Sequence, residues 1–270
     1  MIPAKFDYEV AGSVDQAIEL LGSSDDAKLL AGGHSLLPLM KLRFAQPSLL
    51  VDIGRLSDLS YVREDADHIA IGALTRHHDV ATDTLLGKAN ALVATTAAGI
   101  GDPQVRHMGT IGGSIAHGDP AADMPAVLVA LEAELVAKGP GGERTIAAGD
   151  FFTGFLETAL GPQEVLTEIR VPKADGVYLK FHRRAQDWAT VGVAVSRSNG
   201  SANVALTNMG ATPIRAAGVE EALASGADAA TAAERAAEGT SPPSDPAASG
   251  EFRQHLARVL TRRALEQALS

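Results

Sequence analysis

The chain has 270 residues, of which 46% are hydrophobic, with a mean hydropathy of +0.06 and a formal charge of −10 at pH 7. A chain of this length can bury a sizeable core, and we expect two domains, or one domain with an appendage. The acidic balance argues against binding to nucleic acid or to an anionic membrane surface, because both need clustered Lys and Arg.

Cysteine is absent from the sequence. The chain therefore has no disulfide, no cysteine nucleophile, no Cys-ligated zinc and no iron–sulfur cluster of its own. Redox chemistry on this chain needs a bound organic cofactor or a partner chain. Residues 1–7 lack the apolar core of a signal peptide, and no stretch has the length of a membrane span. We expect an unprocessed cytoplasmic protein.

The N-terminal part of the chain predicts short, mixed elements. A helix is expected at Val14–Leu21, where Ser13 and Gln16 have the spacing of a capping box. Residues 29–31 favour a buried strand that runs into a Gly-Gly pair, and apolar residues 36–40 follow that pair. Further strands are expected at 49–53 and 68–73.

The central part predicts helices and then a hairpin. Helical apolar spacing runs from about 79 to 98, and again over 120–131. Residues 134–137 and 143–147 flank the sequence Lys138-Gly139-Pro140-Gly141-Gly142, which is typical of a hairpin turn.

The C-terminal part begins after an expected strand at 164–171, and a domain boundary is expected near 172–176. A meander of three strands is predicted at 177–184, 190–198 and 203–208, with Asn199-Gly200 as the last turn. Two helical regions follow, at about 219–238 and 250–269, joined by an extended loop at 239–246. The pattern as a whole is α+β.

Two Gly-Gly pairs with polar followers are the most informative motifs. They lie about eighty residues apart, in Ala31-Gly32-Gly33-His34-Ser35 and Thr110-Ile111-Gly112-Gly113-Ser114. Glycine tolerates positive φ and lets N–H groups converge on phosphate oxygens, so two such loops suit the pyrophosphate of a dinucleotide. Neither loop matches the Rossmann or P-loop fingerprint, and either pair alone is also typical of a tight turn. We expect valine at position 112 to abolish cofactor binding while the fold persists.

Histidines and carboxylates offer other sites. His117, Asp119 and Asp123 can ligate a metal ion, and His77-His78 is an adjacent pair. A role around a cofactor accounts for the first group, and neighbours on a helix do not share a face, so we expect no metal site. No Ser-His-Asp set or nucleophile elbow is recognisable, so hydrolase chemistry lacks a site and no catalytic residue is expected on this chain.

Two long motifs carry a family resemblance: LAGGHSLLPLMK at 30–41, and GTIGGSIAHGDP at 109–120 with DMPA at 123–126. They resemble the FAD-binding medium subunit of the molybdenum hydroxylases, the xanthine dehydrogenase family, and within it the medium subunits of aerobic carbon monoxide dehydrogenases. The resemblance covers essentially the whole chain. It implies an α+β fold with a FAD-binding region of the PCMH, or vanillyl-alcohol-oxidase, type in two subdomains, and a small C-terminal α+β domain whose three-stranded sheet is covered by helices. The expected bounds are 1–175 for the first, with subdomains at about 1–55 and 56–175, and 176–270 for the second.

The resemblance also implies a non-covalent FAD site. Residues 30–37 and 110–114 are expected at the pyrophosphate and the ribityl chain, and Ile100 beside the adenine or the flavin. Asp123 is expected to accept hydrogen bonds from cofactor hydroxyls, and Leu166 to pack against the cofactor. The complete expected set is Leu30, Ala31, Gly32, Gly33, His34, Ser35, Leu36, Leu37, Ile100, Thr110, Ile111, Gly112, Gly113, Ser114, His117, Asp123, Leu166, Lys180 and Trp188.

Two members of that set have open alternatives. Lys180 is expected near the isoalloxazine, where a cation favours the reduced flavin, but a lysine on a strand can equally point outward. Trp188 either shields one face of the flavin ring or fills core. Many relatives have Tyr at the position of Trp188 and Asn at that of Ser114, so contacts at these two positions are expected to differ.

The function implied by the resemblance is electron transfer. This chain would carry FAD, while a small partner subunit carries iron–sulfur clusters and a large one carries the molybdenum–pterin site, in a cytoplasmic dimer of heterotrimers. Electrons would pass through FAD to a quinone or NAD, and any association with the inner face of the membrane would run through the partners. Carbon monoxide, an N-heterocycle or an aldehyde would be oxidised on the large subunit. The alternatives are a free-standing FAD-dependent oxidoreductase and a non-catalytic FAD-binding module.

Overall fold

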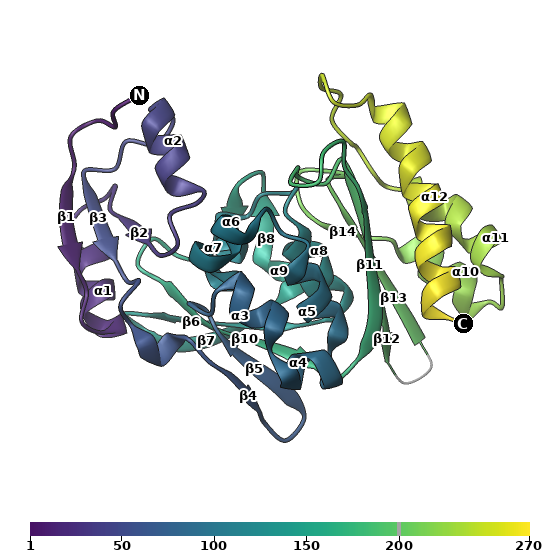
Figure 1. The fold of residues 1–270 in the computed structure, drawn as a ribbon, viewed down its shortest axis with the longest axis horizontal. Helices are drawn as coiled ribbons and strands as arrows, with labels where there is room; N and C mark the ends of the chain where they lie inside the picture. Colours follow the sequence, from purple (N-terminus) through teal and green to yellow (C-terminus); the bar gives the residue numbers. More distant parts are fainter. Residues whose placement is uncertain (199–200) are drawn as a thin grey trace.

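The computed structural model describes residues 1–198 and 201–270, which form three groups of elements lying side by side (Figure 1). A small parallel sheet with two helices lies at one end. A five-stranded sheet covered by short helices occupies the centre, and a four-stranded sheet backed by helices lies at the other end. This α+β arrangement is the fold class that the sequence predicts. None of the helices in the described residues combines the length and the apolar composition that a membrane span requires.

The N-terminal sheet has the strand order β1-β3-β2, with both neighbouring pairs parallel. Helix α1 begins where the capping spacing predicts, because the Ser13 side chain accepts from the Gln16 N–H and the Gln16 side chain accepts from the Gly12 N–H. Its buried face packs on β3. The bounds are β1 Asp7–Val10, α1 Val14–Leu21, β2 Lys28–Leu30, α2 Leu36–Leu42 and β3 Leu49–Asp52.

The central sheet is antiparallel, with the order β4-β5-β10-β6-β7. Its middle strands are the apolar runs recognised in the sequence, and Ile69, Ile71 and Ile169 are fully buried under the helices. The predicted 134–147 hairpin is present. The bounds are η1 Ser57–Leu59, β4 Val62–Glu64, β5 His68–Gly72, β6 Glu134–Gly139, β7 Gly142–Ala147, α9 Ala148–Phe151, β8 Phe152–Gly154, β9 Glu157–Thr158 and β10 Val165–Pro172.

The helical stretch expected at 79–98 is divided into separate helices. Asp83 accepts from the Leu85 and Leu86 N–H groups and so caps a new helix, and Asn90 caps the next one by accepting from the Val93 N–H. Asp and Asn at these positions break the helix because their side chains compete for backbone donors. The bounds are α3 His77–Thr82, α4 Thr84–Ala89, α5 Ala91–Ala98, α6 Pro103–Met108, α7 Ile111–His117 and α8 Asp123–Ala130.

The C-terminal sheet contains the predicted three-strand meander and a fourth, two-residue strand that pairs with β13. The turn expected at Asn199-Gly200 lies outside the described residues. The predicted helix at 219–238 is interrupted near Gly226, which has a φ of +87°. The bounds are β11 Asp175–Phe181, β12 Val191–Ser198, β13 Ser201–Thr207, β14 Ile214–Arg215, α10 Ala217–Ala224, α11 Ala229–Ala233, η2 Glu234–Ala237 and α12 Gly250–Ala268.

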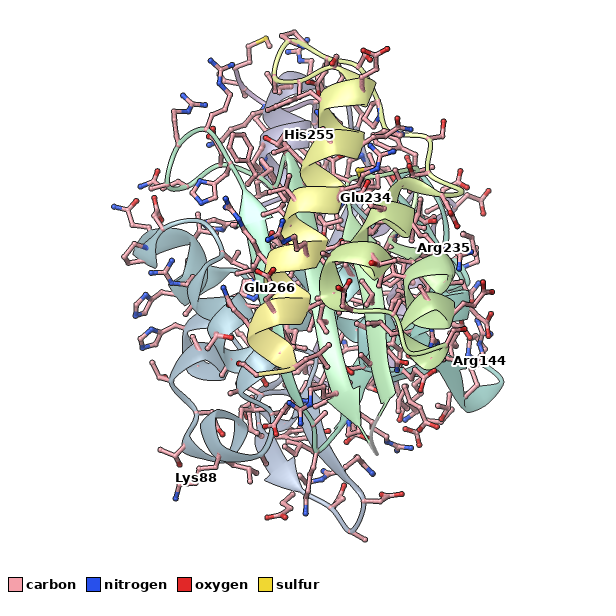
Figure 2. The ribbon with its side chains drawn as sticks, turned by 90° about the vertical axis from the view of Figure 1, so that its right-hand side faces the viewer. Lys88, Arg144, Glu234, Arg235, His255 and Glu266 are labelled. Atoms are coloured by element: carbon pink, nitrogen blue, oxygen red, sulfur yellow. The ribbon has the colours of Figure 1, made fainter. Side chains whose placement is uncertain are left out.

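The two faces of the C-terminal sheet have different neighbours. Helix α12 crosses the outer face, with Leu256 and Leu260 turned inward and the charged or polar side chains of His255 and Glu266 turned to solvent (Figure 2). The inner face joins the central core through Ala194 and its neighbours. The sheet is therefore a wall shared by two cores, and the central helices are held between two sheets.

Close backbone approach explains two of the glycines in the Gly-Gly pairs. A Cβ on Gly112 would lie 2.5 Å from the Ala73 Cβ, and one on Gly32 would collide with the Met108 carbonyl oxygen. Of the four paired glycines, Gly33 alone has a positive φ, at +74°. Gly112 is buried in the first turn of α7 and does not have a positive φ, so the expectation of a positive-φ loop at this position is wrong.

The Gly112→Val variant should therefore be less stable to unfolding than the wild type. Overpacking at a backbone contact of this kind costs about 1–3 kcal/mol, and we expect the free energy of unfolding measured in urea to fall by at least that amount.

Gly87→Ala is the matched control, because a Cβ there meets no atom within 4 Å in α4. The control should raise stability by about 0.5–1 kcal/mol through helix propensity. A Gly112→Val chain as stable as wild type would contradict the packing role.

Candidate functional site

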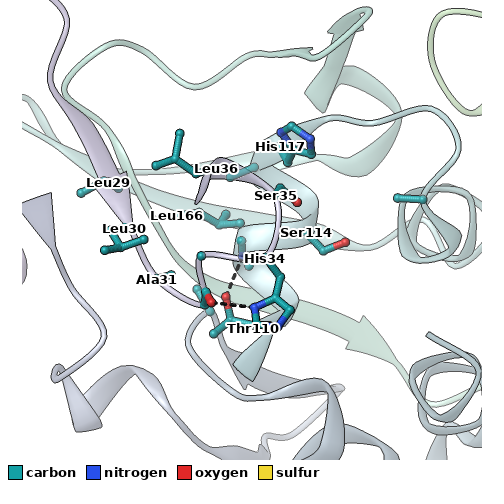
Figure 3. Close-up of a pocket in the computed structure, with 18 of the residues that line it drawn as sticks. Leu29, Leu30, Ala31, His34, Ser35, Leu36, Thr110, Ser114, His117 and Leu166 are labelled. Carbon is teal, nitrogen blue, oxygen red and sulfur yellow. Dashed lines mark hydrogen bonds between the residues drawn. The ribbon is translucent and has the colours of Figure 1, made fainter. Parts of the chain in front are cut away.

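A cleft of about 900 Å³ lies where the three groups of elements meet. Its walls come from the end of β2, the following loop and α2, from the turn before α7, from the start of α8, and from the β8–β9 turn and the loop after β11. Figure 3 shows the two glycine loops side by side in this cleft, where a Cβ on Gly113 would lie 3.9 Å from the Ala31 Cβ. Its volume lies at the upper end of the roughly 300–1,000 Å³ typical of cofactor and ligand sites.

Most residues expected at a FAD site line this cleft. Leu37, Ile111 and Lys180 do not: Leu37 is exposed on α2, Ile111 is fully buried in the central core, and Lys180 lies behind Asp123. The residues that the structure brings together are Leu30, Ala31, Gly32, Gly33, His34, Ser35, Leu36, Ile100, Thr110, Gly112, Gly113, Ser114, His117, Asp123, Leu166 and Trp188.

The first glycine loop offers free donors. Within the described residues, the backbone N–H groups of residues 32–35 make no hydrogen bond to the protein. Gly33 supports this open turn with its positive φ, and the His34 Nδ1–H donates to the Gly32 carbonyl at 3.0 Å. Ser35 precedes α2 without capping it through its side chain, so its hydroxyl is not used there. Several unpaired donors beside a cleft are what an anion-binding loop needs.

The second glycine loop does not offer such donors, which corrects the expectation from its sequence. The Ile111 and Gly112 N–H groups donate to the Thr75 and Ala73 carbonyls, and the Gly113 N–H donates to the Thr110 hydroxyl at 3.1 Å. Thr110 is thereby the N-cap of α7. This loop contributes its glycine surface and the Ser114 side chain to the cleft, but its N–H groups are consumed by the fold.

The adjacent histidines lie in different surroundings. His77 lines the cleft and is 3% exposed, and its Nδ1 has no hydrogen-bond partner in the described chain. Burial, with smaller effects of Arg106 and His34, lowers the pKa of His77 to about 4, so its ring is neutral at pH 7. His78 instead stacks on His107, with ring centroids 4.0 Å apart. Sequence analysis missed His77 as a cleft residue, since only its neighbours in space reveal it.

His117 also lines the cleft, and burial lowers the pKa of its ring. Within residues 1–198 and 201–270, no three His, Asp or Glu side chains gather closely enough to hold a metal ion. His117, Asp119 and Asp123 are therefore not arranged as a metal site in the part of the chain that the structure describes.

A buried ion pair closes the back of the cleft. Lys180 on β11 donates to the Asp123 Oδ2 at 2.6 Å and to the Gly99 carbonyl at 3.0 Å. The Asp123 and Lys180 side chains are 7% and 12% exposed. Burial raises the pKa of Asp123, while the Lys180 charge opposes this rise. The alternative of an outward-pointing Lys180 is therefore wrong.

Trp188 stands at the mouth of the cleft. It lies in the loop after β11 with Gln186 and Asp187, and is 58% exposed, so it does not fill core. The same cleft is also lined by residues 153 and 156–158 of the β8–β9 hairpin, which carried no signal in the sequence. The turn reaches the site through tertiary contacts with α7 and α9.

Comparison with known proteins assigns the family. Residues 4–174 match the FAD binding domain in molybdopterin dehydrogenase, and residues 176–268 match the CO dehydrogenase flavoprotein C-terminal domain. The carbon monoxide dehydrogenase medium chain of Hydrogenophaga pseudoflava is 43% identical over 99% of this chain and 98% of its own. The glyceraldehyde dehydrogenase medium chain of Sulfolobus acidocaldarius is 37% identical over 99% of both chains.

Solved structures agree with the sequence relatives. Carbon monoxide dehydrogenase from Hydrogenophaga pseudoflava superposes with a TM-score of 0.96, covering 100% of this chain and 99% of that one at 43% identity. Quinoline 2-oxidoreductase from Pseudomonas putida gives a TM-score of 0.93 at 32% identity, over 99% and 98% of the two chains. The fold is that of a FAD-binding oxidoreductase subunit. The chain belongs to the medium FAD-binding subunits of the molybdenum hydroxylases, which confirms the resemblance seen in the sequence.

Acid should destabilise the fold through His77. Its pKa is about 4 in the folded chain and 6.5 in the reference state, so below pH 6.5 the unfolded chain binds more protons. Stability should therefore fall as pH drops from 6.5 toward 4, with roughly 3 kcal/mol of the loss due to this residue. We expect His77→Gln to remove that part of the pH dependence in urea unfolding between about pH 7 and 4.5.

His78→Gln is the control for this measurement, because it changes the neighbouring histidine without touching the cleft. It should retain the pH dependence of the wild type. Equal pH dependence in the wild type and His77→Gln would show that the ring of His77 is not held neutral by burial.

Proposed function

We propose that this chain is the electron-relay subunit of a molybdenum hydroxylase. It would bind FAD non-covalently in the cleft, take electrons from an iron–sulfur cluster of a small partner subunit, and deliver them to a quinone or NAD. The observation that carries the proposal is the 900 Å³ cleft with unpaired N–H groups at its first glycine loop. The absence of cysteine agrees, since the chain cannot ligate such a cluster itself.

The cleft residues fit a dinucleotide with separate polar and apolar parts. The N–H groups of residues 32–35 would donate to the pyrophosphate, and the Ser35 and Ser114 hydroxyls would add hydrogen bonds beside it. Asp123 would accept from cofactor hydroxyls. Trp188 would cover part of the ring system and exclude water from it. When bound, FAD supplies the exchange of electrons singly or in pairs.

We further propose that the two matched regions act as domains, 1–175 and 176–270. Separate hydrophobic cores in the N-terminal sheet, the central sheet and the outer face of the C-terminal sheet support this division, and support subdomains near 1–55 and 56–175. The cleft then lies between the subdomains and the C-terminal domain, so cofactor binding would hold all three together.

Substrate oxidation would take place on a large molybdenum subunit, within a cytoplasmic dimer of heterotrimers. The relatives support this separation, because medium chains as similar as these are named for carbon monoxide, glyceraldehyde and nicotine. Medium chains that are similar over nearly their whole length thus belong to enzymes with different names for their substrates. We therefore propose carbon monoxide, an aldehyde or an N-heterocycle as the substrate class of the complex.

Gly33→Val should weaken FAD binding by tenfold or more while the chain remains folded. A Cβ at this position would lie 2.8 Å from the Leu37 Cδ1, and a β-branched residue at positive φ strains the turn by about 1–3 kcal/mol, so the loop that lines the cleft would have to shift. The measurement is a FAD titration of the purified chain, followed by visible absorbance and by quenching of Trp188, the one tryptophan of the sequence.

Gly226→Val is the matched control, because Gly226 has a φ of +87° in the C-terminal region and does not line the cleft. It should bind FAD as the wild type does. Binding by the wild type only with co-expressed partner subunits would mean that assembly completes the site. Failure to bind in either form would contradict the proposal, as would full substrate-to-acceptor turnover by a complex stripped of its flavin.

A further inference from the structure

Behind the cleft, Tyr178 contacts Asp123 of the FAD-binding region and Thr207 of the C-terminal sheet. It lies on β11, two residues before Lys180, so both side chains leave the strand on the same face. The Tyr178 phenol donates to the Asp123 Oδ1 at 2.8 Å, while Lys180 holds the Oδ2. Both oxygens of one buried carboxylate are thus fixed by neighbouring positions of a single strand.

A glycine on the next strand, Gly192, makes this contact possible. Lys180 pairs with Gly192 on β12, and Gly192 pairs with Thr207 on β13. A Cβ on Gly192 would collide with the Tyr178 hydroxyl. The phenol therefore crosses the sheet over Gly192 and lies 3.2 Å from the Thr207 hydroxyl.

The protonation state of the phenol suits a donor. Burial and the charge of Asp123 raise the pKa of Tyr178 well above its usual value, so the hydroxyl keeps its proton at any physiological pH. Because a phenol has one proton, the bond to Asp123 leaves its lone pairs to accept from Thr207. The chain of contacts from Thr207 through Tyr178 to Asp123 is then complete in donors and acceptors.

We propose that Tyr178 is a positioning residue of the cofactor site, which holds the Asp123 carboxylate ionised and turned to the cleft. The inference rests on the proposed role of Asp123 as an acceptor for the bound cofactor. With Lys180 alone, the Asp123 carboxylate could still turn about its Cβ–Cγ bond. Two donors on its two oxygens fix the plane of the group. The C-terminal domain would thereby set the acceptor geometry of a helix in the FAD-binding domain.

Loss of the Tyr178 hydroxyl should change the pH dependence of FAD binding. The titratable or charged groups facing Asp123 are Lys180 and Tyr178 on β11 and His182 in the following loop, and His117 lines the same cleft from α7. Lys180, Tyr178 and His182 lower the pKa of Asp123 against the rise caused by burial. Removing one donor raises that pKa, so the carboxylate takes up a proton at a higher pH.

The test measures the affinity of the full chain, with partner subunits if binding requires them, for FAD across pH. Tyr178→Phe keeps the ring and removes the hydroxyl. We expect about tenfold weaker binding at neutral pH, and an acid midpoint for loss of binding about one pH unit higher than in wild type. Gly192→Ala, which keeps the phenol but occupies the place of its hydroxyl, should change both quantities in the same direction.

Tyr61→Phe is the matched control, because Tyr61 also donates to a carboxylate, Glu168 at 2.6 Å, but does not line the cleft. It should bind FAD with the affinity and acid midpoint of wild type. The Asp123→Asn variant separates the proposed role of Tyr178 from the proposed role of Asp123 as an acceptor. If it weakens binding and removes the acid midpoint while Tyr178→Phe behaves as wild type, the role of Tyr178 is wrong. If Asp123→Asn itself binds FAD normally, Asp123 is not an acceptor for the cofactor and this inference is wrong, whereas the proposed binding of FAD in the cleft stands.

Discussion

The buried ion pair of Asp123 and Lys180 is the contact on which the cleft depends. Each charge pays for leaving water, and that cost is offset because the partner lies at 2.6 Å and further hydrogen bonds reach Lys180 and Asp123. Removing either side chain would leave the other as an uncompensated charge, because both are nearly buried. Helix α8 and strand β11 are therefore held at a fixed distance behind the part of the cleft wall that Asp123 lines.

The glycine loops show how similar sequences serve different physical needs. The first loop leaves its N–H groups unpaired beside the cleft, which makes it suited to an anion. The second is the start of a helix, and its N–H groups bond to Thr110 and to the strand end at 73–75. Glycine is required at 112 because backbone passes too close for any Cβ. The site thus combines one loop that keeps its donors unpaired with one that packs.

Charged side chains also line the cleft, among them Lys28, Glu164 and Asp187, but the buried His77 adds no charge to them at neutral pH. His77 is neutral because burial disfavours its charged form, although the chain as a whole carries a charge of −10. Under the proposed function, anion binding at the first loop would rest on oriented backbone dipoles, which do not titrate. Acid would then act through protonation of Asp123 and through the loss of stability that the buried His77 causes.

Several features were predictable from local sequence. Capping at Ser13, the 134–147 hairpin, the strand runs and the family motifs all follow from residues that are close neighbours in the chain. The division of 79–98 was not predicted, although Asp83 and Asn90 carried the signal as caps. His77 and the β8–β9 turn could not be assigned to the cleft, because nothing in their own segments differs from an ordinary helix start or hairpin.

The sequence by itself determined the fold class, the family and the two glycine motifs that line the cleft, because periodicity, turn chemistry and long motifs are local properties. Tertiary structure alone decided which N–H groups stay free, whether Lys180 points inward, and that Tyr178 passes over Gly192 to reach Asp123. These depend on distances between segments tens of residues apart, such as the 55 residues between Asp123 and Tyr178. Packing sets those distances, and no spacing within one segment encodes them.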